Sequence, residues 1–432
     1  MKKLRNIFIG TLIIGKIFAQ ADVDYVNDNV LRYDDYTYKA NIKTVQLHEE
    51  SWDHAAPIIN LASGEKLEIS FDDLDADQKQ YSVTFIHCNA NWTPSDLMTT
   101  EYIDGFTDLN FINFSFSINT IQKFTHYSLK FPQLNVKFTK SGNYIALVYL
   151  NGDKNEIAIT RRFMVYDNKV NVGHTFRQSI GDDDQFSKQH LDFTINYGQY
   201  NIVDPNRNLQ VVIMQNNRWD NAVTNIKPTF LGGGQLTYSL DDASTFLGGN
   251  EFRYFDIRST RFLTERVKDV YRDEKMMNHA KLVNEESRAT KPYLFYNDFN
   301  GGFVIKNRET SGNQDIEADY IYVDFFMPYL TPESAGNFYL LGKLTDWRMN
   351  SNSMLKYNYA RMGYEKQLYL KQGFYNYIIV LSNDTKTGGD ESVMEGSFWD
   401  TENDYTVLVY HRVLGTYFDQ LIGYKKINSL RK

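Results

Sequence analysis

Apolar side chains recur at every second position in many short segments of the chain, and Gly, Asn or Asp residues close most of these segments. This spacing is typical of β-strands, because successive side chains of a strand point to opposite faces of its sheet. The pattern predicts strands at residues 66–71, 80–87, 143–149, 158–166, 190–197, 209–214, 235–240, 250–258, 320–326, 337–341, 365–370 and 375–381. The predicted fold class is therefore all-β with little helix, built from tandem immunoglobulin-like, early-set β-sandwich domains.

The chain of 432 residues is longer than one hydrophobic core usually supports, so more than one domain is expected. The polar, Gly-containing stretch 306–319 is typical of a crossing between domains. We expect an N-terminal sandwich in residues 20–170, a middle β-rich domain in 171–317 and a C-terminal sandwich in 318–432. Residues 264–290 have apolar positions that would also suit a helix, but their many charges favour an extended hairpin or a linker.

The first 19 residues have the three parts of a secretory signal peptide. Basic residues precede an apolar run from Ile7 to Ile14, and small residues follow at Ala19 and Ala21. We expect cleavage after Ala19, with cleavage after Ala21 as the alternative. The apolar run is far shorter than the roughly 20 residues that a membrane-spanning helix needs. The mature protein is therefore expected to be exported and not to span a membrane.

Charge and composition narrow the classes of partner and cofactor. The chain carries 46 basic and 54 acidic residues, and removal of the four basic residues of the signal peptide gives a mature charge of 42 − 54 = −12. Lys and Arg are not clustered, so no nucleic acid is expected as a partner. The single cysteine excludes a disulfide within the chain and any zinc or iron–sulfur site with several cysteines.

Two motifs resemble chemical sites but lack a part that the chemistry needs. Residues 73–77 begin like a calcium loop, yet Gln78 and Thr84 stand where that loop needs a glycine and a bidentate glutamate, so an acidic turn is expected. His87 and Cys88 are adjacent on a predicted strand and point to opposite faces, so they do not form a catalytic pair. We expect Cys88 in a sandwich core, and we expect no cofactor, no metal and no catalytic residue; a carboxylate pair for glycoside hydrolysis has no location in the sequence.

The C-terminal region resembles a second kind of module. Residues 340–347 (LLGKLTDW) and 371–377 (KQGFYNY) are similar to the strand motifs of starch-binding and early-set sandwich modules. In such a module Trp347 would stack on a sugar ring, although a core position for Trp347 is the favoured interpretation. An exported glycan-binding β-sandwich protein of the cell envelope is therefore the alternative function.

The N-terminal sandwich carries a more specific set of motifs. In order, these are SFDDLDAD at 70–77, FIHCNANW at 85–92, EYIDGF at 101–106, SINT at 117–120, THY at 125–127 and SGNY at 141–144. Together they resemble the plug protein family of the type IX secretion system of Bacteroidota. The resemblance continues through DFNGG at 298–302 into the terminal sandwich and covers most of the mature chain.

This resemblance implies a non-enzymatic periplasmic protein, held at the outer membrane through a translocon. It would bind the periplasmic opening of the giant SprA-type outer-membrane barrel, seal it when no cargo passes, and be linked indirectly to a PorV-type shuttle protein. Aromatic residues are common anchors at such interfaces. The candidate contacts, chosen because they lie in or beside turns of the first domain, are Asp72, Asp73, Asp75, Asp77, Asn91 and Trp92.

Overall fold

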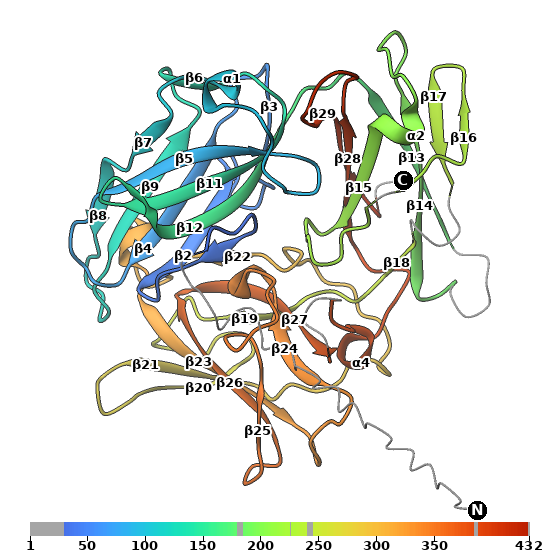
Figure 1. The fold of residues 1–432 in the computed structure, drawn as a ribbon. Helices are drawn as coiled ribbons and strands as arrows, with labels where there is room; N and C mark the ends of the chain where they lie inside the picture. Colours follow the sequence, from blue (N-terminus) through green and yellow to red (C-terminus); the bar gives the residue numbers. More distant parts are fainter. Residues whose placement is uncertain (1–29, 179–184, 225, 240–244, 384–387, 431–432) are drawn as a thin grey trace, which may run out of the picture.

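In the described residues the regular secondary structure is almost entirely β-strand, and the strands form three sandwiches (Figure 1). A computed structural model describes residues 30–178, 185–224, 226–239, 245–383 and 388–430. The predicted signal peptide and both expected cleavage positions lie outside the described residues. The helices in the described parts are short: α1 (Thr99–Tyr102), α2 (Pro205–Asn208), α3 (Gln314–Glu317), α4 (Ser392–Glu395) and a 3-10 turn at Lys343–Thr345. The predicted all-β class with little helix is confirmed.

The first sandwich consists of two sheets that face each other across one core. One sheet has the order β1-β12-β11-β5-β7 with β3 beside β12, the other has the order β2-β4-β9-β8, and β6 pairs with β10 in a separate ribbon. The strands are β1 (Tyr36–Thr37), β2 (Ile42–Glu49), β3 (Ile58–Asn60), β4 (Leu67–Asp73), β5 (Tyr81–Cys88), β6 (Ile103–Gly105), β7 (Asp108–Asn110), β8 (Asn113–Phe116), β9 (Thr125–Phe131), β10 (Val136–Phe138), β11 (Gly142–Leu150) and β12 (Asp153–Tyr166).

Alternation along these strands explains the core of the first sandwich. Every second side chain of β4 and β5 is buried in it: Leu67, Ile69, Phe71, Tyr81, Val83 and Phe85. Burial of one such side chain stabilises the fold by about 1.5–3 kcal/mol. The period-two pattern of the sequence therefore corresponds to the inward-facing positions of two facing sheets.

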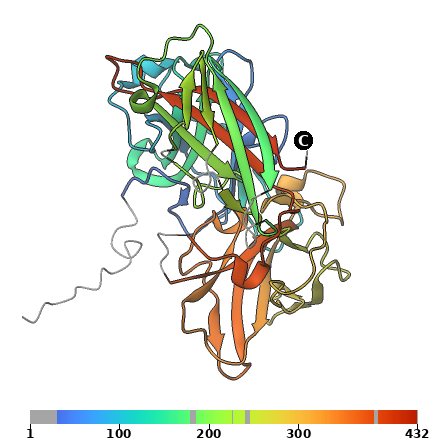
Figure 2. The same ribbon diagram turned by 90° about the vertical axis from the view of Figure 1, so that its right-hand side faces the viewer.

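The second sandwich takes strands from two distant parts of the chain. One sheet has the order β13-β14-β17-β16 with β18 beside β14, and the other is β15-β28-β29. The strands are β13 (Asn171–Gln178), β14 (Lys188–Asn196), β15 (Leu209–Gln215), β16 (Phe230–Gly232), β17 (Gln235–Tyr238), β18 (Thr245–Leu247), β28 (Asp404–His411) and β29 (Gln420–Asn428). Figure 2 shows the red C-terminal strands lying beside the green strands of this sandwich. Its core joins Leu191 and Ile195 to Val407 and Val409.

In the sequence, the third sandwich is inserted between the two parts of the chain that form the second sandwich. Its sheets have the orders β20-β21-β23-β26-β25 and β19-β27-β22, with β24 beside β27. The strands are β19 (Arg253–Asp256), β20 (Val267–Arg272), β21 (Asn278–Leu282), β22 (Phe303–Ile305), β23 (Tyr320–Pro328), β24 (Asn337–Leu341), β25 (Lys356–Asn358), β26 (Gly363–Lys371) and β27 (Gly373–Ser382). Strands β20 and β21 form the antiparallel hairpin that was expected within residues 264–290.

The strand pairing divides the chain differently from the expected boundary between 171–317 and 318–432. The third sandwich runs from β19 to α4, so it takes residues from both of those ranges. The polar stretch 306–319 lies inside it and contains α3. Residues 404–428 belong to the second sandwich and not to the third, because β28 pairs with β15 along the whole length of β15. The pairing of strands that lie about 190 residues apart is a tertiary contact that local alternation does not encode.

Candidate functional site

Asp72, the first of the predicted contact residues, is buried between the first and third sandwiches. Its Oδ2 accepts hydrogen bonds from Lys371 Nζ at 2.5 Å and from the Tyr320 hydroxyl at 2.8 Å. Asp72 and Lys371 each expose only 1% of their side chains. Burial alone would raise the pKa of Asp72, but Lys371 and His126 hold it below its ordinary value. Contrary to the expectation, this carboxylate binds another part of its own chain.

Asp73 is also buried, and it anchors the acidic turn on a lysine. Lys79 Nζ lies 2.8 Å from Asp73 Oδ2, forms an ion pair with Asp75, and lies 3.4 Å from Asp77 Oδ1. Burial alone would lower the pKa of Lys79, whereas its bonds to Asp73 and Asp75 raise it above the ordinary value. The ammonium group of Lys79 therefore lies among the carboxylates of this turn. The side chains of Asp75 and Asp77 remain 54% and 60% exposed.

Asn91 and Trp92, the other two candidates, point in different directions. Asn91 is exposed, and its side chain accepts hydrogen bonds from the backbone and hydroxyl groups of Thr93. Trp92 is buried against the second sandwich, edge-to-face with Trp219 at 5.0 Å between ring centroids. The Arg162 guanidinium lies over the Trp92 ring at 5.1 Å. The expectation of a contact with an external partner is therefore corrected for Asp72, Asp73 and Trp92, because each is enclosed by its own chain.

An apolar cluster also joins the first and second sandwiches, and Cys88 belongs to it. Its members include Cys88, Ala90, Ile145 and Met164 from the first sandwich, and Val212, Met214, Leu408, Tyr410 and Leu421 from the second. Cys88 is buried as expected, although between two sandwiches rather than within one core. Burial raises the pKa of the Cys88 thiol to about 12 and lowers the pKa of His87 to about 4. Neither group is prepared for nucleophilic chemistry near neutral pH.

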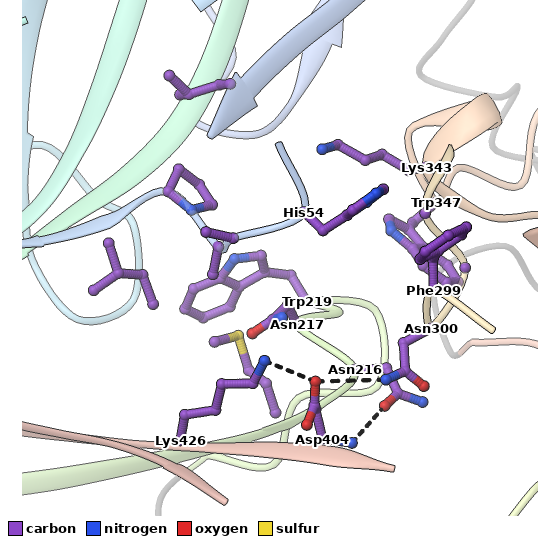
Figure 3. Close-up of a pocket in the computed structure, with 18 of the residues that line it drawn as sticks. His54, Asn216, Asn217, Trp219, Phe299, Asn300, Lys343, Trp347, Asp404 and Lys426 are labelled. Atoms are coloured by element: carbon purple, nitrogen blue, oxygen red, sulfur yellow. Dashed lines mark hydrogen bonds and ion pairs between the residues drawn. The ribbon is translucent and has the colours of Figure 1, made fainter. Parts of the chain in front are cut away.

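A cavity of about 670 Å³ opens where the three sandwiches meet. Figure 3 shows side chains from all three facing this space: His54 from the first sandwich, Trp219, Asp404 and Lys426 from the second, and Phe299, Lys343 and Trp347 from the third. The His54 and Phe299 rings stack with centroids 4.4 Å apart. The cavity volume lies within the range of about 300–1,000 Å³ that is usual for ligand sites.

Two sequence motifs meet in the wall of this cavity. The backbone N–H of Lys343 donates a hydrogen bond to Gly301 O at 2.8 Å, which joins the 340–347 motif to the 298–302 motif. Gly301 has φ of +80°, and a Cβ atom there would lie 2.3 Å from Trp347 Cη2. The carboxylate of Asp298 accepts backbone hydrogen bonds from Asn300 and Phe252, and burial raises its pKa to about 7. Both motifs therefore fix the geometry of the junction.

Trp347, the predicted sugar-stacking residue, is in contact with protein on several sides. The Arg218 guanidinium lies over its ring at 4.6 Å, the Phe252 ring meets it edge-to-face at 5.9 Å, and Gly301 lies against its edge. These contacts favour a packing role for Trp347 in the cavity wall.

An exposed apolar tip at the end of the first sandwich was missed by sequence reasoning. We define this tip as Phe106 and Leu134, which are 65% and 95% exposed. The Phe106 N–H donates to Asn135 O at 2.9 Å, next to the β6–β10 ribbon, so the loops that carry the two residues are fixed together. Gly105, at φ +106°, allows this approach because a Cβ there would lie 2.1 Å from Asn135 O. Figure 1 shows β6 at the end of this sandwich that points away from the third. A phenylalanine directly after the glycine of the 101–106 motif was the available signal.

The described residues hold no group of three or more His, Cys, Asp or Glu side chains placed to bind a metal ion. In the same parts of the chain, no helix combines the length and the apolar character needed to cross a membrane.

The first of the three joined sandwiches carries the ordered motifs, and this sandwich also matches a known protein family. Residues 42–167 match the model of the type 9 secretion system plug protein 1st domain, so the first sandwich is a first domain of the plug protein family. The chain is also similar to a hypothetical protein from Parabacteroides merdae ATCC 43184, whose crystal structure is known at 2.30 Å resolution. The two are 30% identical, with a TM-score of 0.88 over 92% of this chain and 100% of that chain. No match was found among curated proteins. Family membership indicates a role in type IX secretion and a place in the cell envelope.

Proposed function

We propose that this protein is a non-enzymatic periplasmic plug, which binds the periplasmic opening of the giant SprA-type outer-membrane translocon and seals it when no cargo passes. It is held at the outer membrane through the translocon, and a PorV-type shuttle protein is an indirect partner. The observation that carries this proposal is the family match of the first sandwich, combined with the way that sandwich is fixed to the other two.

A seal over an opening wide enough for folded cargo has to resist deformation, and the contacts between sandwiches supply that stiffness. The buried Asp72–Lys371 ion pair joins the first sandwich to the third. The Tyr410 hydroxyl donates to Asn143 Oδ1 at 2.8 Å and joins the second to the first. Both side chains of the Asp72–Lys371 pair are buried and can pair only when the two sandwiches meet in this one arrangement, so the pair fixes how the first sandwich docks on the third.

The apolar tip of the first sandwich is the surface that we propose for contact with the translocon. Adjoining apolar side chains that are exposed together on a monomer commonly mark interaction sites, and aromatic residues dominate the energetics of many interfaces. The backbone N–H of Phe106 is bonded to Asn135 O next to the β6–β10 ribbon, so little backbone entropy is lost when Phe106 is covered. The exposed candidates Asp75, Asp77 and Asn91 remain proposed contacts outside this tip, because Asp75 and Asp77 follow the end of β4 that lies opposite the tip, beside the third sandwich.

The test is co-purification of the translocon with tagged protein from detergent-solubilised outer membranes of its own cells. Phe106→Asp and Leu134→Asp are expected to reduce recovery of the barrel at least tenfold. Leu330→Asp is the matched control, since Leu330 is also a highly exposed leucine (82%) but lies on the third sandwich. Entry of a large antibiotic into cells that carry each variant in place of the native gene measures sealing. Absence of the barrel from the native pull-down, together with unchanged antibiotic entry on deletion, would refute the function.

Equal loss in all three variants, Leu330→Asp included, would instead refute the assignment of the contact surface to the tip. Native-like circular dichroism spectra for each variant are the control for folding.

A further inference from the structure

One edge of the β2-β4-β9-β8 sheet is open. Strand β8 pairs with β9 on one side, and within the described residues no strand pairs with its other side. The opposite edge of the same sheet, β2, lies beside the third sandwich, where the Thr44 and Tyr320 hydroxyls share a hydrogen bond at 2.7 Å. Figure 1 shows β8 on the outer side of the first sandwich, away from the second. Strand β8 is therefore the edge of this sheet that faces solvent.

The backbone of β8 presents hydrogen-bonding groups along this edge. The Ser117 N–H donates at 2.9 Å to the carbonyl of the residue that precedes β9. Because the direction of bonding alternates along an antiparallel strand, the N–H and C=O groups of Phe114 and Phe116 point away from β9. The Ile118 N–H points the same way and donates to Ile316 O of the third sandwich at 2.9 Å. This edge therefore already binds backbone from outside its own sheet, and the groups of Phe114 and Phe116 are placed to bind more.

The side chains of the same segment alternate between apolar and uncharged polar residues. Residues 112–118 read INFSFSI. Ile112, Phe116 and Ile118 are 80%, 52% and 46% exposed. Phe114 packs on the core of the first sandwich, and the Phe116 ring meets it edge-to-face at 5.8 Å between centroids. Natural edge strands are usually protected from further pairing by charges, proline or bulges, and this segment has none of these. Such an unprotected edge is typical of a site at which a strand is added.

From the open backbone and the exposed apolar row we propose that β8 binds an extended, uncharged segment of a partner protein, which joins the four-stranded sheet as a fifth strand. The segment would pair with the backbone of Phe114 and Phe116, and its apolar side chains, at every second position, would cover Ile112 and Phe116.

A second copy of the chain is a poorer occupant of this edge. Strand β8 has four residues, and a symmetric pair of such short strands falls short of the about 1,200–2,000 Å² that a stable interface usually buries. An extended segment can be short, because its main-chain hydrogen bonds supply much of the affinity. The proposal does not rest on the sealing function, since it concerns a different surface from the apolar tip.

The experiment measures fluorescence anisotropy of a labelled hexapeptide, with alternating valine and threonine and blocked termini, against the full mature chain. The same peptide with a methyl group on every peptide nitrogen is the backbone control, because it cannot donate hydrogen bonds to the edge. We expect saturable binding of the unmethylated peptide only. Phe116→Lys and Ile112→Lys should each weaken this binding at least about fivefold, since a charge opposite an apolar side chain disfavours strand pairing. Phe230→Lys is the matched control, at an exposed phenylalanine (64%) on the edge strand β16 of the second sandwich, and should bind like the native chain.

Equal binding of the two peptides, or native affinity in both β8 variants, would overturn the proposal. Hydrogen exchange followed by mass spectrometry locates the bound peptide: it should slow exchange in residues 112–118, and slowing only elsewhere would overturn the assignment to β8. A dimer of the mature chain in light scattering that Phe116→Lys converts to a monomer would assign the edge to a second copy and overturn the partner segment. Thermal unfolding of the variants separates loss of binding from loss of folding. None of these outcomes bears on co-purification with the translocon, so the two proposals fail independently.

Discussion

The ion pair between Asp72 and Lys371 offers the most direct test of how the sandwiches are held together. Lys371→Met removes the cation and keeps a side chain of similar length. The Asp72 carboxylate then stays buried with the Tyr320 hydroxyl and His126 as partners but without its ion-pair partner. Leaving a buried charge uncompensated costs about 3–5 kcal/mol, so the free energy of unfolding should fall by about that amount at pH 7.

The matched control is an ion pair of the same chemistry on the surface. Lys130 Nζ lies 2.9 Å from Glu50 Oε1, and these side chains are 48% and 40% exposed. Lys130→Met should change the free energy of unfolding by less than about 1 kcal/mol, because water and salt already screen an exposed pair. Chemical denaturation followed by tryptophan fluorescence and by circular dichroism measures both variants. The two signals also show whether the sandwiches still unfold together.

The pH dependence of the free energy of unfolding provides a second test of the Asp72–Lys371 pair. In the native chain the pKa of Asp72 lies below its unfolded value, so its contribution to stability is present above pH ~4 and is lost as the pH falls through the folded pKa. In Lys371→Met, burial without the lysine should raise the pKa of Asp72, so the variant should lose stability as the pH rises above ~4. The difference between the two proteins should therefore shrink in acid. A loss below about 1 kcal/mol at pH 7, or a difference that stays constant with pH, would refute the reasoning.

Three further predictions concern the cavity wall and the interface between the first and second sandwiches. Gly301→Ala should lower the midpoint of thermal unfolding clearly more than Gly152→Ala, since both glycines have positive φ but only Gly301 has Trp347 within 2.3 Å of the added Cβ; equal shifts would contradict the clash. Because the pKa of Asp298 is raised to about 7, its contribution to stability is fully present below pH ~4 and is lost as the pH rises through 7. Asp298→Asn should therefore reduce the change in the free energy of unfolding with pH, measured by denaturation between pH 5 and 8. An unchanged pH dependence would show that another group titrates there. Cys88 should react with a thiol reagent at pH 8 only after unfolding, and rapid labelling of the native chain would show an accessible thiolate.

Alternation along the chain was sufficient to locate most strands. The predicted segment 337–341 coincides with β24, and 143–149 and 320–326 lie within β11 and β23. These strands have one or both faces buried, and burial imposes a side-chain pattern that a single sequence displays. The way strands combine into sandwiches was not visible, because β15 and β28 carry no local mark of their pairing.

The candidate site was predicted less well, for a related reason. Asp72 and Asp75 belong to the same acidic motif, yet one is buried and the other is exposed. The difference comes from Lys371, which reaches Asp72 from 299 positions away in the sequence. The type of a residue indicates what its side chain can bind, whereas tertiary contacts decide whether that side chain is exposed to a partner. The exposed Phe106 was overlooked because apolar residues near strands are usually assigned to the core.

The insertion of the third sandwich within the second has a consequence for the order in which the protein matures. The sheet that contains β15 lacks its central strand until β28 is available, so half of the second sandwich core cannot close while residues 404–428 are absent. A chain that emerges from its amino end can complete the first sandwich early, and the third before the second. The second sandwich closes last, around partners that are already folded. The final assembly step therefore brings together all three walls of the interdomain cavity.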